Sequence, residues 1–234
     1  MAIYAIGDLH LSFGVDKPMD IFSGWDNHTE RIKENWCRLV GPEDTVIIPG
    51  DISWGINFRE IKPDFEFIDS LPGKKIISKG NHDYWWSTMK KMNEFLEENG
   101  FGSIRLLFNN AYEVEDYAIC GTRGWFFDDD TGEMDKIVGR ECGRLKLSID
   151  AARKTGKEPA VFLHYPPLTL ESECGPIMDV LREEGIKNCF YAHLHGKAIH
   201  YAFNGERDGI RFRLVSCDAV NFSPLPVLRR KGEK

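Results

Sequence analysis

Three short apolar runs alternate with three segments of helical hydrophobic spacing in the first hundred residues. Each apolar run is the length of a buried strand and is followed within two residues by a glycine. Strands that alternate with helices in this way predict parallel strands joined by crossover helices. We therefore expect strands over residues 2–6, 45–49 and 74–78, with helices over residues 26–40, 58–71 and 85–98.

The second half of the chain is richer in strand-like runs, and runs that follow one another directly favour hairpins. These runs are "SIRLLFNN", "AYEVED", "YAICGTRGWFF", "AVFLHYPP", "NCFYAHLH", "HYAFNGE" and "IRFRLVS". Helices are predicted over residues 135–154 and 176–184, and the acidic stretch 126–135 is expected to be a surface loop. Together the two halves predict a single mixed α/β domain over residues 1–228 and a basic tail over residues 229–234.

The charge balance argues against a polyanionic partner. Thirty basic and 37 acidic side chains give a net charge of −7, which disfavours nucleic acid and anionic membranes. The net charge alone does not exclude a nucleic-acid partner, because bound metal ions would make the charge at a binding site positive. No stretch approaches the ~20 apolar residues of a membrane span, and the six cysteines form no CxxC pair. We therefore expect a cytoplasmic protein with reduced thiols and no membrane contact.

Five of the apolar runs end on side chains that bind metal ions. In open α/β sheets, ligands bind beyond the carboxyl ends of the strands, so residues far apart in sequence can meet there. Taken alone, a histidine after a strand is commonly a surface residue, an aspartate can cap a helix and an asparagine can make a turn. Occurring at five strand ends, such residues predict one metal site with the ligands Asp8, His10, Asp51, Asn81, His164, His193 and His195.

Seven ligands are too many for one tetrahedral ion. Carboxylate, amide and imidazole donors without a placed cysteine suit Mn²⁺, Fe or Zn²⁺ better than Cu(I) or Ca²⁺. Two divalent ions about 3.5–4 Å apart would use all seven ligands, and such a pair clamps phosphate and generates hydroxide near neutral pH. Asp51 follows the middle strand and is the expected bridge between the ions.

These motifs resemble those of the calcineurin-like metallophosphoesterase family, in the order in which that family has them. The family series is D-x-H, G-D, G-N-H-D/E, a lone histidine and G-H-x-H, and here it extends from Asp8 to His195. One position departs from the series, because Ala192 stands where the family usually has glycine. The family fold is a four-layer αββα sandwich of two mixed sheets, which the resemblance predicts for this chain.

The resemblance also implies a role for each residue. The first ion would be held by Asp8, His10 and His195, and the second by Asn81, His164 and His193. Asp51 would bridge them, and a hydroxide activated by the two ions would be the nucleophile. His82 would contact the phosphate or protonate the leaving oxygen, with Asp83 orienting its ring. An imidazole held by a carboxylate is a tuned general acid.

The substrate is predicted less directly. The chain reads "GDISWG" and "GNHD", so it lacks the arginine of the protein Ser/Thr phosphatase branch, which resembles "GD-x-x-D-R-G". A small-molecule phosphodiester or phosphomonoester is therefore favoured. Arg123 could bind a phosphate oxygen, although a structural salt bridge explains it as well. The aromatic residues near the motifs have two possible uses: they fill space between the loops and the core, or they stack on a nucleobase of the substrate. Filling space is the favoured interpretation for Trp54, Tyr84, Trp85, Trp86 and Tyr165.

Two alternatives to a small-molecule hydrolase remain. The first is a catalytically inactive metallophosphoesterase fold that acts as a protein-interaction scaffold. One subunit of retromer resembles such a scaffold. A scaffold has no use for a general acid, and this chain keeps His82 and the full ligand set. The second alternative is a nuclease, against which the net negative charge argues.

Overall fold

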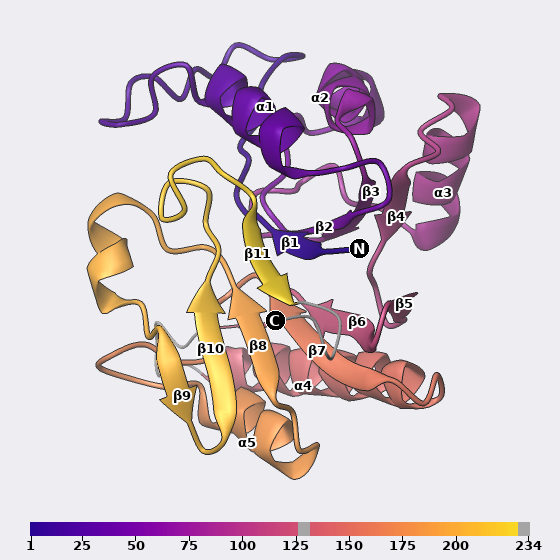
Figure 1. Ribbon diagram of the computed structural model, residues 1–234. Helices are drawn as coiled ribbons and strands as arrows, with labels where there is room; N and C mark the ends of the chain where they lie inside the picture. The colour runs from indigo at the N-terminus through magenta and orange to yellow at the C-terminus, as the bar shows by residue number, and fades with distance from the viewer. Residues whose placement is uncertain (126–131, 229–234) are drawn as a thin grey trace.

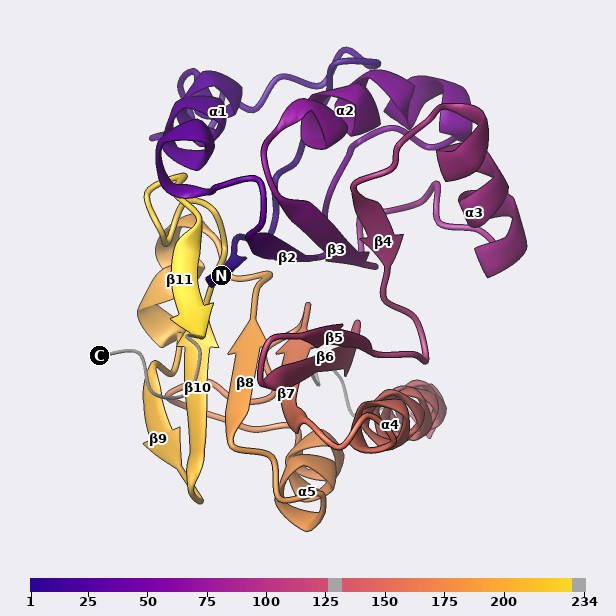
Figure 2. The same ribbon diagram turned by 45° about the vertical axis from the view of Figure 1, so that its right-hand side comes forward.

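The computed structural model describes residues 1–125 and 132–228. It shows two mixed β-sheets packed face to face between two layers of helices (Figures 1 and 2). This is the predicted four-layer αββα sandwich. Residues 126–131 of the predicted acidic loop and the predicted tail over residues 229–234 lie outside the described residues.

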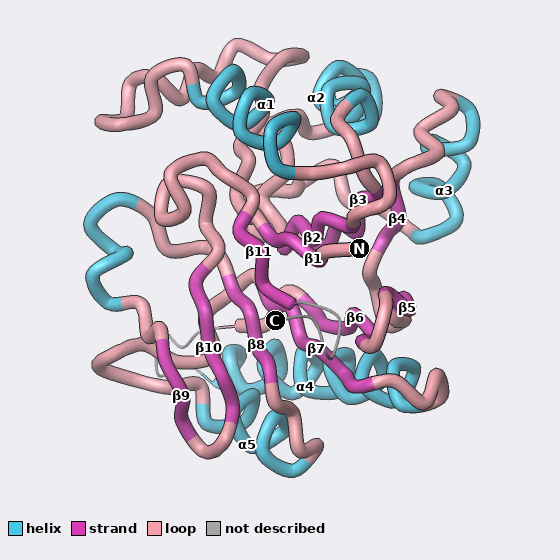
Figure 3. The backbone as a smooth tube through the Cα atoms, in the orientation of Figure 1, coloured by secondary structure: helices cyan, strands magenta, loops and turns pink. Residues whose placement is uncertain are grey.

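The first sheet contains the three strands predicted near the N-terminus. Its order is β11-β1-β2-β3-β4, with β1 to β4 parallel and β11 antiparallel at the edge. Helices α1, α2 and α3 connect the parallel strands and cover the outer face of the sheet (Figure 3). The strands are β1 (Ile3–Ala5), β2 (Thr45–Pro49), β3 (Lys74–Ser78), β4 (Ile104–Leu106) and β11 (Leu225–Leu228), and the helices are α1 (His28–Leu39), α2 (Phe58–Ser70) and α3 (Met89–Glu98).

The second sheet has the order β5-β6-β7-β8-β10-β9. Its four central strands are parallel, so the predicted hairpins are confined to the edges, where β5 pairs with β6 and β9 with β10. The crossover helices α4 and α5 cover its outer face and make the parallel arrangement possible. The elements are β5 (Tyr112–Val114), β6 (Tyr117–Thr122), α4 (Gly132–Arg153), β7 (Glu158–Leu163), α5 (Gly175–Glu183), β8 (Asn188–Tyr191), the short 3₁₀ helix η1 (Gly196–Tyr201), β9 (Gly205–Arg207) and β10 (Ile210–Leu214).

Two local predictions differ from the structure. The run "HYAFNGE" was predicted to be one strand, but it is divided between the end of η1, an isolated bridge at Ala202 and the start of β9. Strand β11 was missed because it is short and contains Pro226. Proline lacks the amide proton that an inner strand needs, and β11 tolerates it as an edge strand.

Three layers of buried apolar side chains hold the four layers of secondary structure together. One cluster lies between the first sheet and its helices, around Ile48 and Trp36, and another between the second sheet and its helices, around Val161 and Leu145. A third cluster lies between the sheets and includes Ile47. Alternate residues of β2 therefore face opposite sides, as expected of a strand buried on both faces.

The described residues include no helix that is both long enough and apolar enough to cross a membrane. All six cysteines are free, and Cys120 and Cys189 are among the buried ones.

Candidate metal centre

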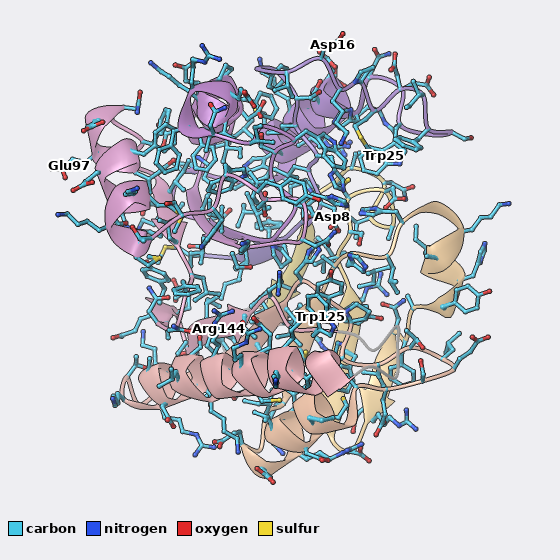
Figure 4. The ribbon with its side chains drawn as sticks, turned by 180° about the vertical axis from the view of Figure 1, so that it is seen from behind. Asp8, Asp16, Trp25, Glu97, Trp125 and Arg144 are labelled. Atoms are coloured by element: carbon cyan, nitrogen blue, oxygen red, sulfur yellow. The ribbon has the colours of Figure 1, made fainter. Side chains whose placement is uncertain are left out.

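The loops that follow five strands meet at one place, at the carboxyl ends of both sheets. The loops after β1, β2 and β3 come from the first sheet, and the loops after β7 and β8 come from the second. The contacts between them are direct: His164 Nδ1 lies 3.0 Å from the carbonyl oxygen of Pro49, and His193 N donates to Asp8 Oδ2 at 3.0 Å. Figure 4 labels Asp8 among these side chains. The structure thus brings all seven predicted ligands together.

The backbone at this centre is held in an unfavourable conformation. Four of the predicted ligands have φ angles in the left-handed region, which costs on the order of 1 kcal/mol or more per non-glycine residue. Hydrogen bonds between the first two loops, from Asp8 N to Gly50 O and from His10 N to Asp51 O at 3.0 Å each, hold two of them. The four are Asp8 (58°), His10 (45°), Asp51 (51°) and His193 (75°).

Two glycines allow the loops to approach one another. A Cβ atom on Gly80 would lie 2.1 Å from Asp51 Oδ1, so any side chain there would displace the carboxylate. A Cβ atom on Gly7 would lie 2.7 Å from the Cβ of Ala192. Ala192, which departs from the motif series, therefore fits because the residue facing it is a glycine.

The ligand atoms form two groups. Asp8, His10 and His195 offer one, and Asp51, His164 and His193 offer the other, with the donor atoms of each group within 4.8 Å of one another. Asn81 belongs with the second group, because its Oδ1 lies 2.6 Å from His164 Nε2. The division matches the one that the family resemblance implies.

Asp51 lies between the groups. Its Oδ2 is 3.8 Å from Nε2 of His10 in the first group and 3.6 Å from Nε2 of His164 in the second. Its Oδ1 accepts the backbone N–H of His82 at 2.8 Å. One carboxylate oxygen of Asp51 is therefore directed at both groups, as a bridging ligand requires.

Burial makes the charges of this centre interdependent. Burial, together with the negative charge of Asp8, raises the pKa of Asp51 to about 7. Burial would also raise the pKa of Asp8, but the charge and hydrogen bond of His195, together with the charges of His164 and His10, outweigh it, and the pKa is lowered. Burial and His164 lower the pKa of His193 to about 3. Two buried carboxylates beside a neutral imidazole are suited to divalent cations, and the buried Nε2 of His195 has no hydrogen-bond partner among the described residues.

Comparison with known proteins agrees with this geometry. The sequence model of the calcineurin-like phosphoesterase family matches residues 1–197. The chain belongs to this family. No curated protein sequence matches it significantly.

Two solved structures are similar to the phosphoesterase over nearly all of both chains. The phosphopantetheinyl hydrolase PptH from Mycobacterium tuberculosis is 14% identical, with a TM-score of 0.52 and coverage of 100% of this chain and 96% of that one. A protein of unknown function, AQ665 from Aquifex aeolicus, is 18% identical with a TM-score of 0.49, and 96% and 94% of the two chains are covered. At such identities, the likeness to PptH shows a shared fold only, and the second score is too low to support an argument.

His82 of the phosphoesterase lies beside the centre and outside both donor groups. Its ring centroid is 4.5 Å from that of Trp54 and 5.7 Å from that of His10. Its Nδ1 is buried and has no hydrogen-bond partner among the described residues. The ring therefore lies beside the donor groups with one nitrogen unpaired, and its predicted role toward a substrate stays a prediction.

The structure corrects the predicted role of Asp83. Its carboxylate accepts hydrogen bonds from backbone N–H groups of Asp51 (2.9 Å), Ile52 (2.9 Å) and Gly80 (2.7 Å), and from Trp85 Nε1 (3.1 Å). Within the described residues it makes no hydrogen bond with the ring of His82. Asp83 instead joins the ligand loop after β2 to the loop after β3. The sequence could not distinguish these roles, because two of the donors are backbone groups of a loop about 30 residues away.

We expect Asp83→Ala to lower the free energy of unfolding by about 3–5 kcal/mol, because it leaves several buried N–H groups unpaired. Asp20→Ala, which changes an exposed aspartate, is the matched control. Urea denaturation followed by circular dichroism measures the difference. A loss of catalytic rate in Asp83→Ala with unchanged stability would instead support the predicted role of orienting His82.

Asp218 is a functional candidate that the sequence reasoning missed. Its Oδ1 lies 3.0 Å from His195 Nδ1, and its Oδ2 accepts the N–H of Gly196 at 2.8 Å. With a metal ion bound, this contact would keep a proton on Nδ1 and leave Nε2, which lies 3.4 Å from Asp8 Oδ1, free as a ligand. The available signal was a carboxylate shortly after the apolar run "IRFRLVS", the same pattern that marked the other ligand loops.

We expect Asp218→Ala to weaken metal binding by about 10- to 100-fold, as is usual for partners of metal-binding histidines. Saturating metal should restore most of the rate, because Asp218 acts through His195. Metal titration followed by activity and by calorimetry tests this. Asp208→Ala, which removes an exposed carboxylate bonded to Arg182, is the control, and equal metal affinities in the two variants would contradict the positioning role.

Asp64 ties two ligand loops to helix α2. It is buried and accepts hydrogen bonds from Phe13 N at 2.8 Å and from Ser53 Oγ. Burial raises its pKa from 3.8 to about 6, so the folded protein holds a proton that the unfolded chain has already released. Stability should therefore fall as the pH rises from about 4 to about 6, by on the order of 2 kcal/mol. Denaturation measured across this pH range should show that the free energy of unfolding falls in the wild type and not in Asp64→Asn. Equal slopes of the free energy of unfolding against pH in the two proteins would contradict the raised pKa of Asp64.

The remaining predicted residues surround the centre. Trp54 stacks on His10 with ring centroids 4.8 Å apart, and Tyr165 lies 4.3 Å from His193. Trp85 is buried in the core, as the space-filling interpretation predicts, whereas Tyr84 is 64% exposed. Trp86 packs against the same core, and Arg123 Nη2 lies 3.9 Å from Glu141.

Proposed function

We propose that this calcineurin-like phosphoesterase hydrolyses phosphate esters of small molecules with two divalent ions. The observation that carries the proposal is the position of Asp51 Oδ2, at 3.8 and 3.6 Å from one histidine of each donor group. Mixed oxygen and imidazole donors favour Mn²⁺, Fe or Zn²⁺. The first ion would be held by Asp8, His10 and His195, the second by Asn81, His164 and His193, and both by Asp51.

The bound ions would polarise the phosphoryl oxygens and lower the pKa of water. The task of His82 is to give a proton or a hydrogen bond to the leaving oxygen. Burial and the neighbouring His164 lower the pKa of His82, and the negative charge of a bound phosphate would raise it again. The backbone of His82 donates to Asp51, so the main chain that carries the ring is held against the proposed bridging ligand.

The test is hydrolysis of bis-p-nitrophenyl phosphate and p-nitrophenyl phosphate by protein that is stripped of metal and then given Mn²⁺, Fe²⁺ or Zn²⁺. We expect turnover that depends on the added metal, and the ratio of the two rates distinguishes a diesterase from a monoesterase. No turnover of either ester with any metal would refute the enzyme and favour a scaffold. Faster cleavage of single-stranded DNA or RNA, falling steeply with salt, would favour a nuclease.

Two further choices complete the proposal. A phosphopantetheine diester belongs in the substrate panel, because one structure of similar fold is named a phosphopantetheinyl hydrolase. We also propose that the protein acts in the cytoplasm, because its six cysteines are free and four of them are buried.

A further inference from the structure

A cavity of about 100 Å³ next to the metal centre is lined by three cationic side chains, those of Lys79, Arg123 and Arg144. Glu141 lines the same cavity. A water molecule needs about 10–15 Å³ of such space, so the cavity has room for a tetrahedral oxyanion. The lining carries an excess of two positive charges.

Lys79 and Arg123 have no anion within hydrogen-bond distance among the residues that the structure describes. The carboxylate of Glu141 is buried and accepts hydrogen bonds from Thr122 Oγ1 at 2.6 Å and from Arg144 Nη1 at 2.5 Å. Arg123 Nη2, at 3.9 Å, is beyond hydrogen-bond distance. Among the described residues, no carboxylate lies within 4 Å of Lys79 Nζ.

The cavity is joined to the second donor group through the backbone. Lys79 precedes Asn81 by two residues, and the carbonyl oxygen of Arg123 accepts the N–H groups of His164 (3.1 Å) and Tyr165 (2.8 Å). In Figure 4, Arg144 is labelled at helix α4, and Trp125 and Asp8 are labelled in the same view. Two of the cavity's cations are therefore tied through the backbone to two predicted ligands of the second donor group, Asn81 and His164.

We propose that this cavity binds a second phosphate group of the substrate, so that the natural substrate is a phosphoester that carries a further phosphate. The proposal rests on the proposed hydrolysis at the metal centre and specifies its substrate class. Within the part of the chain that the structure describes, Lys79 and Arg123 are two cations without a hydrogen-bonded anion, which matches the charge of a phosphate dianion. The guanidinium of Arg123 can bind such a group with two parallel hydrogen bonds. Cations that served only to neutralise Glu141 would not require both Lys79 and Arg123.

The experiment compares alkane bisphosphonates of increasing chain length with the monophosphonates of the same lengths. Both series are measured as inhibitors of bis-p-nitrophenyl phosphate hydrolysis and as ligands of the metal-loaded protein by calorimetry. At the chain length that binds most tightly, we expect the wild type to bind the bisphosphonate about tenfold or more tightly than the monophosphonate. This is the gain in affinity expected from a hydrogen bond to a charged group. The preference should disappear in Arg123→Gln and in Lys79→Gln, both of which leave Glu141 its hydrogen bonds from Thr122 and Arg144. It should persist in Arg140→Gln, which changes an exposed arginine of helix α4.

The two proposals can fail separately. A wild type without preference, or a preference that both cavity variants retain, would overturn the phosphate cavity even if the ester is hydrolysed. Absence of ester hydrolysis, with a calorimetric preference that still depends on Lys79 and Arg123, would overturn the proposed function and support the cavity as a phosphate site.

Discussion

Asp51→Asn is expected to lower kcat/KM for bis-p-nitrophenyl phosphate by about 10³-fold. The reason is that Asp51 Oδ2 lies between the two donor groups, so loss of its charge weakens the binding of both ions. Metal ions contribute several kcal/mol of transition-state stabilisation, and about 4 kcal/mol corresponds to this factor. Asparagine preserves the size of the side chain and one oxygen for the hydrogen bond from His82 N. Steady-state kinetics and metal content per chain measure the effect.

His195→Asn is the comparison that isolates bridging. His195 belongs to the first donor group only, so its loss should weaken one ion and cost less activity than the loss of Asp51. Asp51→Asn should release both ions, and His195→Asn should release only one. Equal losses of rate and metal in the two variants would contradict a bridge at Asp51.

His82→Ala is expected to keep both metal ions and to lose about 10²- to 10⁴-fold in kcat on alkyl phosphoesters, the usual contribution of a general acid. The loss should be smaller on p-nitrophenyl esters, whose leaving group needs little protonation. The structure supports this difference because His82 lies beside the centre without belonging to either donor group.

The control for this variant is His200→Ala, which changes an exposed histidine on η1 outside both donor groups. Metal content by inductively coupled plasma analysis separates a catalytic role from a ligand role. Loss of metal from His82→Ala, or an equal rate loss on good and poor leaving groups, would refute the assignment of a general acid.

The ligands could be predicted from the sequence because each follows a short apolar run directly. Strand ends are local features, and the carboxyl ends of parallel strands meet at one edge, so Asp8, Asp51 and Asn81 could be placed together before the fold was known. The family motif then divided the ligands into two groups, and the donor atoms in the structure divide in the same way.

The features that were missed or corrected depend on contacts between distant parts of the chain. Asp218 meets His195 across 23 residues, and Asp83 meets the N–H groups of a loop about 30 residues away. Strand β11 pairs with β1 from the other end of the chain. Hydrophobic periodicity carries no information about such partners. The parallel order of the second sheet was missed for a related reason, since consecutive strands suggested hairpins where α4 and α5 act as crossovers.

The most direct test of a two-metal centre is a crystal structure of Mn²⁺-loaded protein with anomalous scattering data. We predict two anomalous peaks, one among Asp8, His10 and His195 and one among Asn81, His164 and His193, both within bonding distance of Asp51. A single peak, or two peaks that share no contact with Asp51, would contradict the account.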